Sequence, residues 1–176
     1  IGERPVGFDT CDYSKEEMMD LSGVSVDEMT LDDLFDAAGS ASSEETAKVM
    51  QIAADTLDGL EAVNQDELDK SLRLKVALDE IRKNGGYDAF AIRCWPETFT
   101  EYGGAVCGPA SLLGEARVPC ACEADVYGAL TQLVLQEVAQ APVFLTDLVD
   151  MDVNDNTGVV WHCGQAPISM RDPDYK

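Results

Sequence analysis

The sequence predicts an α/β domain: a three-layer, Rossmann-like arrangement with a mostly parallel sheet flanked by helices. Two observations support this expectation. Short apolar runs that suit buried strands alternate with longer amphipathic segments, and the helical segments begin with recognisable capping residues. Of the 176 residues, 45% are hydrophobic and 26% are charged, which is typical of a globular chain. Residues 1–176 are therefore expected to form a single domain.

Helices dominate the predicted first half of the chain. Each begins with a Ser, Thr or Asn that can accept hydrogen bonds from the free N–H groups of a first turn, and acidic residues follow. The expected starts are Ser14, Thr30, Ser42 and Asn64. The last of these helices should run to Lys83, because Gly85 and Gly86 favour a helix end.

Strands and helices alternate in the second half. The apolar runs at residues 87–94, 118–122, 142–145 and 158–161 predict strands, and residues 109–113 and 125–140 predict helices. Strands joined through helices pair in parallel, and ligands of such sheets collect beyond the carboxyl ends of the strands. Functional residues are therefore sought where these apolar runs end.

The charge balance limits the possible partners. There are 34 acidic and 12 basic residues, giving a formal charge of −22. Nucleic acid and anionic membranes both require clustered Lys and Arg, so neither is an expected partner. The first residues show no signal-peptide pattern and no initiator Met, and we expect a segment of a longer cytoplasmic protein.

Six cysteines leave two interpretations open. Most lie in apolar, strand-like runs, where a reduced cysteine behaves as a small hydrophobic residue, and reduced thiols are the favoured expectation. The alternative is a structural zinc site built from Cys120, Cys122, His162 and Cys163, although the spacing of Cys120 and Cys122 is not that of a zinc finger.

Carboxylates follow two of the predicted strands directly. Glu97 comes after the run at 87–94, and Glu123 and Asp125 come after the run at 118–122. If the strand ends meet at one edge, these three side chains can share a divalent cation, and oxygen ligands suit Mn²⁺ or Mg²⁺ better than zinc. Glu123 or Asp125 could instead cap the following helix, and Glu101 is an alternative to Glu97 in the same loop.

His162, the only histidine, follows the last predicted strand. It could be a hydrogen-bonded structural residue, or it could take part in a site at a third strand end. Trp95 and Trp161 flank the same region and could offer an apolar face to a ligand ring, although core packing is the ordinary role of tryptophan.

Several uncommon motifs occur together across residues 87 to 167. They are RCWPE at 93–97, YG at 102–103, Cys107, CEADVYGALT at 122–131 and WHCG at 161–164. In these motifs the chain resembles the L-fucose/L-arabinose isomerase family, most nearly its fucose-isomerase-like branch. Before residue 85 only the order of elements agrees.

The resemblance implies that the chain is the central domain of a manganese-dependent aldose–ketose isomerase that assembles into homo-oligomers. In that family, two carboxylates of this region and a histidine from the C-terminal domain hold the metal, and that histidine has no counterpart here. Asp125 looks like one catalytic carboxylate and Glu97 like the other, while Trp95, Glu101 and His162 are the expected sugar-binding residues. The reaction implied passes through an ene-diol. A non-catalytic sugar-binding or assembly domain of the same fold is the alternative.

Overall fold

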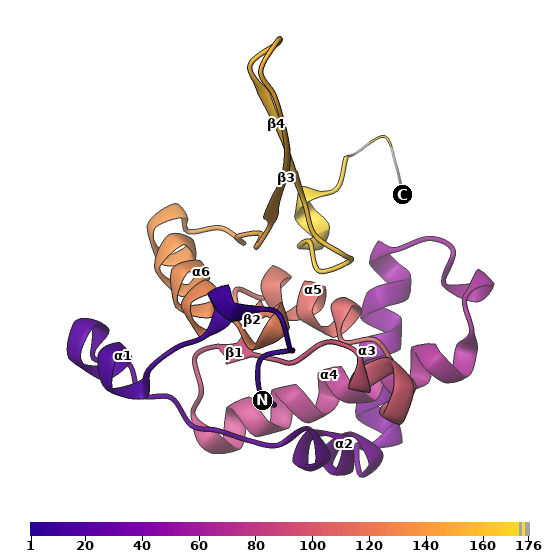
Figure 1. Ribbon diagram of the computed structural model, residues 1–176. Coiled ribbons are helices and arrows are strands. Elements are labelled where there is room, and N and C mark those ends of the chain that lie inside the picture. The colour runs from indigo at the N-terminus through magenta and orange to yellow at the C-terminus, as the bar shows by residue number, and fades with distance from the viewer. Residues whose placement is uncertain (173, 175–176) are drawn as a thin grey trace.

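The computed structural model describes residues 1–172 and 174, and it consists mainly of helices around a small parallel sheet (Figure 1). The helices and strands of the described residues are α1 (Lys15–Ser22), α2 (Leu31–Gly39), α3 (Ser43–Thr56), α4 (Gln65–Gly85), β1 (Phe90–Ala91), α5 (Cys107–Glu115), β2 (Cys120–Ala121), α6 (Val126–Ala139), β3 (Asp147–Asp152) and β4 (Thr157–Trp161). Single 3₁₀ turns occur at Asp9–Cys11, Leu60–Ala62, Cys122–Ala124 and Ile168–Met170, and a π-helical turn at Thr98–Tyr102.

The helices of the first half begin where the capping residues predict. The Thr30 hydroxyl accepts a hydrogen bond from the Asp33 backbone N–H at 3.1 Å, and the Asp33 carboxylate accepts one from the Thr30 backbone N–H. Ser14, Ser42 and Asn64 likewise accept backbone hydrogen bonds at the starts of α1, α3 and α4. Each such cap stabilises its helix by about 1 kcal/mol.

The parallel pair is compatible with the predicted α/β class. Strands β1 and β2 pair in parallel, with Phe90 opposite Cys120 and Ala91 opposite Ala121. Parallel strands require a crossover, and α5 supplies it here. Helix α6 contacts both strands, while α5 contacts β2 and packs on α4. The carboxyl ends of β1 and β2 therefore lie side by side.

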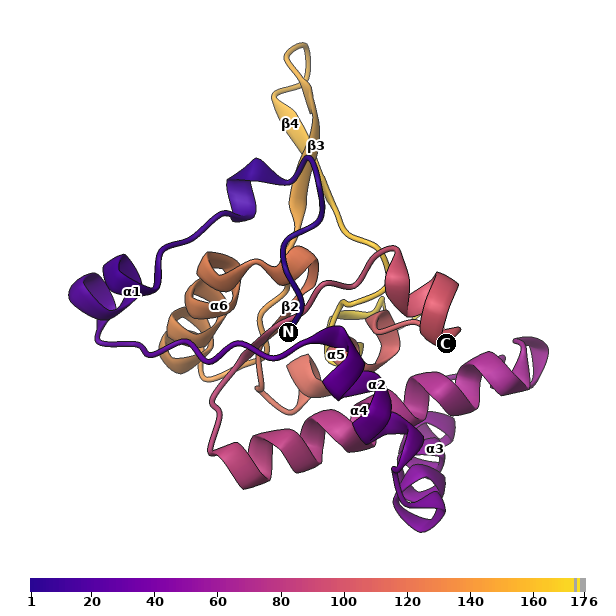
Figure 2. The same ribbon diagram turned by 60° about the horizontal axis from the view of Figure 1, so that its bottom comes forward.

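The described residues do not form the extended, mostly parallel three-layer sheet that the sequence predicts. No strand forms at 142–145, and β4 pairs antiparallel with β3 in a separate hairpin. Figures 1 and 2 show this hairpin projecting from the helical body. Aspartates at 147, 150 and 152 interrupt β3, and both hairpin strands are exposed throughout. A strand covered on both faces needs a nearly continuous apolar run, which β3 lacks.

The main core lies where β1 and β2 meet helices α2, α4 and α5. Its most deeply buried side chains are Leu34, Leu74, Leu78, Ile92, Val106 and Leu113. Full burial of such a side chain contributes about 1.5 to 3 kcal/mol, so this cluster fixes the strand ends firmly. No helix in the described part of the chain combines the length and the apolar composition that crossing a membrane requires.

Candidate functional site

The turn after β2 has an unusual backbone. Glu123 and Ala124 both adopt the left-handed conformation, with φ of 59° and 53°. Non-glycine residues rarely adopt it, and the cost is about 1 to 3 kcal/mol for each residue. Two contacts from the end of β1 hold the turn: the Ala124 N–H donates to the Ile92 carbonyl at 3.0 Å, and the Glu123 N–H donates to Cys94 Sγ at 3.4 Å.

The turn places Glu123 beside a buried histidine. Glu123 Oε1 lies 3.9 Å from His162 Nε2, and the His162 side chain is only 2% exposed. Neither ring nitrogen of His162 has a hydrogen-bond partner among the described residues. Burial raises the pKa of the Glu123 carboxyl group; nearby Asp147 and Asp125 raise it further, and His162 opposes them. A carboxyl group with a raised pKa is suited to acid–base work near neutral pH.

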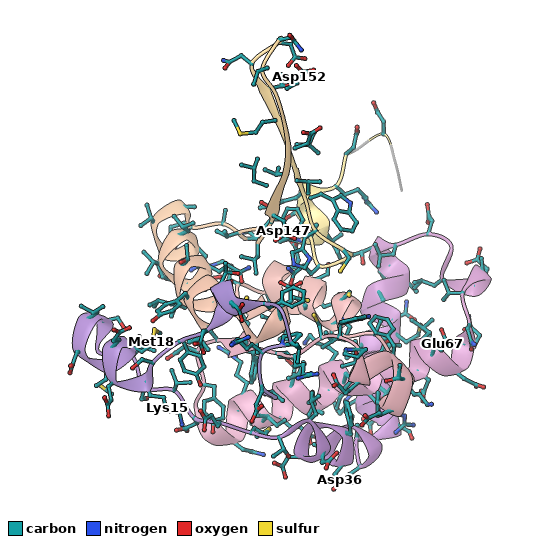
Figure 3. All side chains as sticks on the ribbon, in the orientation of Figure 1. Lys15, Met18, Asp36, Glu67, Asp147 and Asp152 are labelled. Atoms are coloured by element: carbon teal, nitrogen blue, oxygen red, sulfur yellow. The ribbon has the colours of Figure 1, made fainter. Side chains whose placement is uncertain are left out.

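Asp147 acts on the pKa of Glu123, although the sequence analysis did not select it. It begins β3 and lies where the hairpin joins the helical body (Figure 3). Its charge acts on Glu123 and also on Cys11. The sequence placed the strand too early, at 142–145, so residue 147 fell in an expected loop.

Asp125 caps α6, which confirms the structural alternative weighed for it. Its Oδ1 accepts a hydrogen bond from the Gly128 N–H at 2.8 Å. Gly128 makes room for this carboxylate, since a Cβ at that position would lie 2.8 Å from the Asp125 Cγ. Capping does not preclude a second role, because a carboxylate has further lone pairs to offer. Its role as a metal ligand or catalytic group remains a prediction.

Glu97 is held by a partner that the sequence analysis did not consider. Arg93 Nε donates to Glu97 Oε2 at 2.6 Å, and Arg93 Nη2 lies 2.5 Å from Oε1. This bidentate pair lowers the pKa of Glu97. No hydrogen bond or ion pair in the described residues joins Glu97 to Glu123 or Asp125. The spacing of four residues between Arg93 and Glu97 was the signal that could have revealed the pair.

The remaining predicted ligand-binding residues lie at the surface. Trp95 is 57% exposed and Trp161 is 59% exposed, so neither is packed in the core. Glu101 is exposed in the π-helical turn. Each of these side chains is accessible to a ligand.

The residues present fit a divalent metal only in part. Glu123 and Asp125 provide carboxylate oxygens of the type that Mn²⁺ or Mg²⁺ prefers. However, within residues 1–172 and 174 no three His, Cys, Asp or Glu side chains are grouped so that they could hold a metal ion. The same finding leaves the zinc alternative without support in the described part of the chain. All six cysteines are free thiols.

An apolar hollow lies elsewhere in the molecule. It has a volume of about 350 Å³ and lies between α3, α4, α5 and the turn at Ile168–Met170. Its lining contains none of the predicted site residues and is mostly aliphatic. We therefore assign the candidate site to the turn after β2, where the carboxyl groups and the histidine meet.

Comparison with known proteins finds relatives over nearly the whole chain. No family model matches it. Curated proteins named sulfoquinovose isomerase are similar to it: it is 34% identical over 174 residues to one from Clostridium sp. (strain MSTE9), covering 99% of this chain. It is 30% identical over 175 residues to that of Priestia megaterium and 32% identical over 174 residues to that of Alkalicoccus urumqiensis. The chain spans about two fifths of the length of these relatives, 39% of the first.

Proposed function

We propose that this chain carries the carboxylate part of the active site of an aldose–ketose isomerase, and that the full-length protein acts on sulfoquinovose or a closely similar aldose. The pair of half-buried Glu123, at the carboxyl end of a parallel strand, and buried His162 is the observation that carries the proposal. The sulfoquinovose isomerases that match nearly the whole chain support it. We also propose that the protein is related to the L-fucose/L-arabinose isomerase family.

The proposed chemistry is proton transfer through an ene-diol. One carboxylate removes a proton from the sugar carbon next to the carbonyl, and a carboxylic acid returns a proton to the neighbouring carbon. The raised pKa of Glu123 suits it to this exchange, and Asp125 lies two residues away on a rigid cap. Glu97 remains our choice for a further carboxylate, with Glu101 as the alternative. Glu97 would have to leave Arg93 to reach a ligand.

Manganese, or magnesium, is the cofactor that we propose for the full-length protein. Glu97, Glu123 and Asp125 would supply oxygen ligands, and residues outside this chain would complete the set, because the described residues hold no such group of three. When bound, the cation would polarise the sugar carbonyl.

We further propose that the full-length protein is a cytoplasmic homo-oligomer in which the parallel pair of this chain forms part of a larger Rossmann-like sheet. The hairpin of β3 and β4 supports assembly with another domain or subunit. Leu148, Met151, Val160 and Trp161 are each more than half exposed on it. An apolar surface of this kind usually contacts another domain or subunit.

The test is an isomerisation assay of the full-length protein. Sulfoquinovose, L-fucose, L-arabinose and other aldoses are supplied after chelator treatment, with and without added Mn²⁺. We expect turnover of sulfoquinovose that requires the metal. Absence of turnover of every aldose in the presence of Mn²⁺ and Mg²⁺ would contradict the proposed function.

A matched pair of variants ties the activity to the site. Glu123→Gln should lower kcat by about a hundredfold or more, since general acid–base groups contribute that much. Glu80→Gln changes an exposed glutamate on α4 and should leave kcat unchanged within about twofold. Full activity in Glu123→Gln would remove Glu123 from the mechanism.

A further inference from the structure

Four cysteines from separate parts of the chain lie near one another. The Cys122 thiol acts on the pKa of both Cys94 and Cys107, and the Cys163 thiol acts on the pKa of Cys107. Cys94 and Cys122 are buried, Cys107 is half-buried, and Cys163 is exposed. The group therefore extends from the solvent inward to Cys94, whose sulfur accepts the hydrogen bond from the Glu123 backbone.

The outer pair, Cys107 and Cys163, is held in place by the chain around it. Cys107 begins α5, and Cys163 precedes Gly164, which has φ of +68°. A Cβ at residue 164 would lie 3.1 Å from the Cys107 Cβ, so the close approach of the two segments favours glycine there. Ser111 of α5 also donates a hydrogen bond to the Ala166 carbonyl at 2.6 Å. The segment after β4 thus lies along α5, as Figure 1 shows.

The two thiols differ in acidity: the pKa of Cys107 is lowered and that of Cys163 is raised. The neighbouring Cys122 thiol first, and then Cys163, favour the Cys107 thiolate and lower the Cys107 pKa to about 6. Partial burial of the thiol, and after it the nearby Cys107 charge, raise the pKa of Cys163 to about 11. Cys107 is therefore the nucleophile, and Cys163 remains a thiol beside it.

We propose that Cys107 and Cys163 are an oxidation site that reacts with hydroperoxides and closes into a reversible disulfide. In the first step the Cys107 sulfur attacks one peroxide oxygen and the O–O bond breaks, which gives a sulfenic acid and one water from hydrogen peroxide, or one alcohol from an organic hydroperoxide. In the second step the Cys163 sulfur attacks the sulfenic sulfur, which releases one water and forms the S–S bond. The peroxide accepts the two electrons that the two thiols lose. This proposal does not depend on the proposed isomerase activity.

The experiment maps cysteine oxidation in the full-length protein. The reduced protein is treated with hydrogen peroxide at pH 6, remaining thiols are alkylated, and the peptides are analysed by mass spectrometry. We expect a peptide pair linked through Cys107 and Cys163 that disappears after dithiothreitol. At this pH a larger fraction of Cys107 is thiolate, although each low-pKa thiolate is a weaker nucleophile. The net effect should be that Cys107 oxidises about tenfold faster than an ordinary exposed thiol.

Three variants test the assignment of roles. Cys11→Ser changes a buried cysteine outside the group and should leave the linked peptide unchanged. Cys163→Ser should abolish it and leave a sulfenic acid at Cys107 that dimedone traps. Cys107→Ser should leave Cys163 slow to oxidise. The absence of the Cys107–Cys163 link in the unmodified protein, or an equal dimedone yield at Cys163 in Cys107→Ser, would overturn the proposal.

Discussion

The structure shows that Asp125 caps α6, and we propose that it also takes part in catalysis. Two substitutions separate these roles. Asp125→Asn removes the charge but keeps an oxygen that can accept the hydrogen bond from the Gly128 N–H, which is 2.8 Å long in the native chain. Asp125→Ala removes both. Asn caps helices about as well as Asp, whereas Ala costs about 1 kcal/mol at a cap.

The cap effect can be measured locally by hydrogen exchange in the full-length protein. A loss of about 1 kcal/mol corresponds to about a fivefold increase in opening, so amides in the first turn of α6 should exchange about fivefold faster in Asp125→Ala. In Asp125→Asn they should change by less than about twofold. If the carboxylate takes part in the reaction, kcat should fall by about a hundredfold or more in both variants.

Two outcomes would refute the reasoning. Full turnover of Asp125→Asn would leave Asp125 as a cap alone. Faster exchange throughout α6 in Asp125→Asn, equal to that of the Ala variant, would show that the charge rather than the hydrogen bond holds the helix start.

Three further predictions concern neighbouring residues. Gly128→Ala should push the Asp125 carboxylate aside and lower kcat as strongly as Asp125→Asn, measured in the same assay, because the new Cβ would lie 2.8 Å from Cγ. Glu123→Gln should raise the unfolding temperature of the metal-free protein at pH 7; the Glu123 pKa is raised, so this gain should disappear as the pH falls below its ordinary value of 4.5. Arg93→Met should lower the unfolding temperature at pH 7, and since the pKa of Glu97 is lowered, the difference should shrink as the pH falls below 4.5; a difference independent of pH would contradict this.

Local signals in the sequence were sufficient for the helices and for the ends of the parallel pair. Thr30 and Asn64 mark helix starts through hydrogen bonds that span only two or three residues. Glu123 was selected because it follows an apolar run, and that run does form a strand end. The sequence left open whether Asp125 caps a helix, and the hydrogen bond from the Gly128 N–H to its carboxylate shows that it does.

Contacts between distant parts of the chain could not be predicted from the sequence. The apolar run at 158–161 suits a buried strand as well as an exposed one. Only its pairing with β3 shows that it is part of an exposed hairpin. That pairing brings Asp147 to Glu123, and the return of the chain to α5 brings Cys163 to Cys107. A single sequence carries no signal for such pairs, because their partners are tens of residues away.

His162 shows how stability and function can be separated at this site. Its side chain is 2% exposed, and both ring nitrogens lack partners among the described residues. Leaving a polar group buried without a partner costs about 1 to 3 kcal/mol. A purely structural histidine would be expected to recover that cost through hydrogen bonds, whereas a histidine that awaits a ligand would not.

His162→Leu should therefore leave the unfolding temperature of the full-length protein unchanged or higher, because an apolar side chain of comparable size removes the unsatisfied nitrogens. The same substitution should lower kcat/KM for sulfoquinovose, since Glu123 loses its neighbour at 3.9 Å. Thermal unfolding and the isomerisation assay, performed on the same preparation, measure both effects. Val159→Ala, at an exposed position of β4, provides the control for local disturbance. A His162→Leu variant that unfolds at a lower temperature while keeping full turnover would show that His162 is structural, and the Glu123–His162 pair would then no longer support the proposed function.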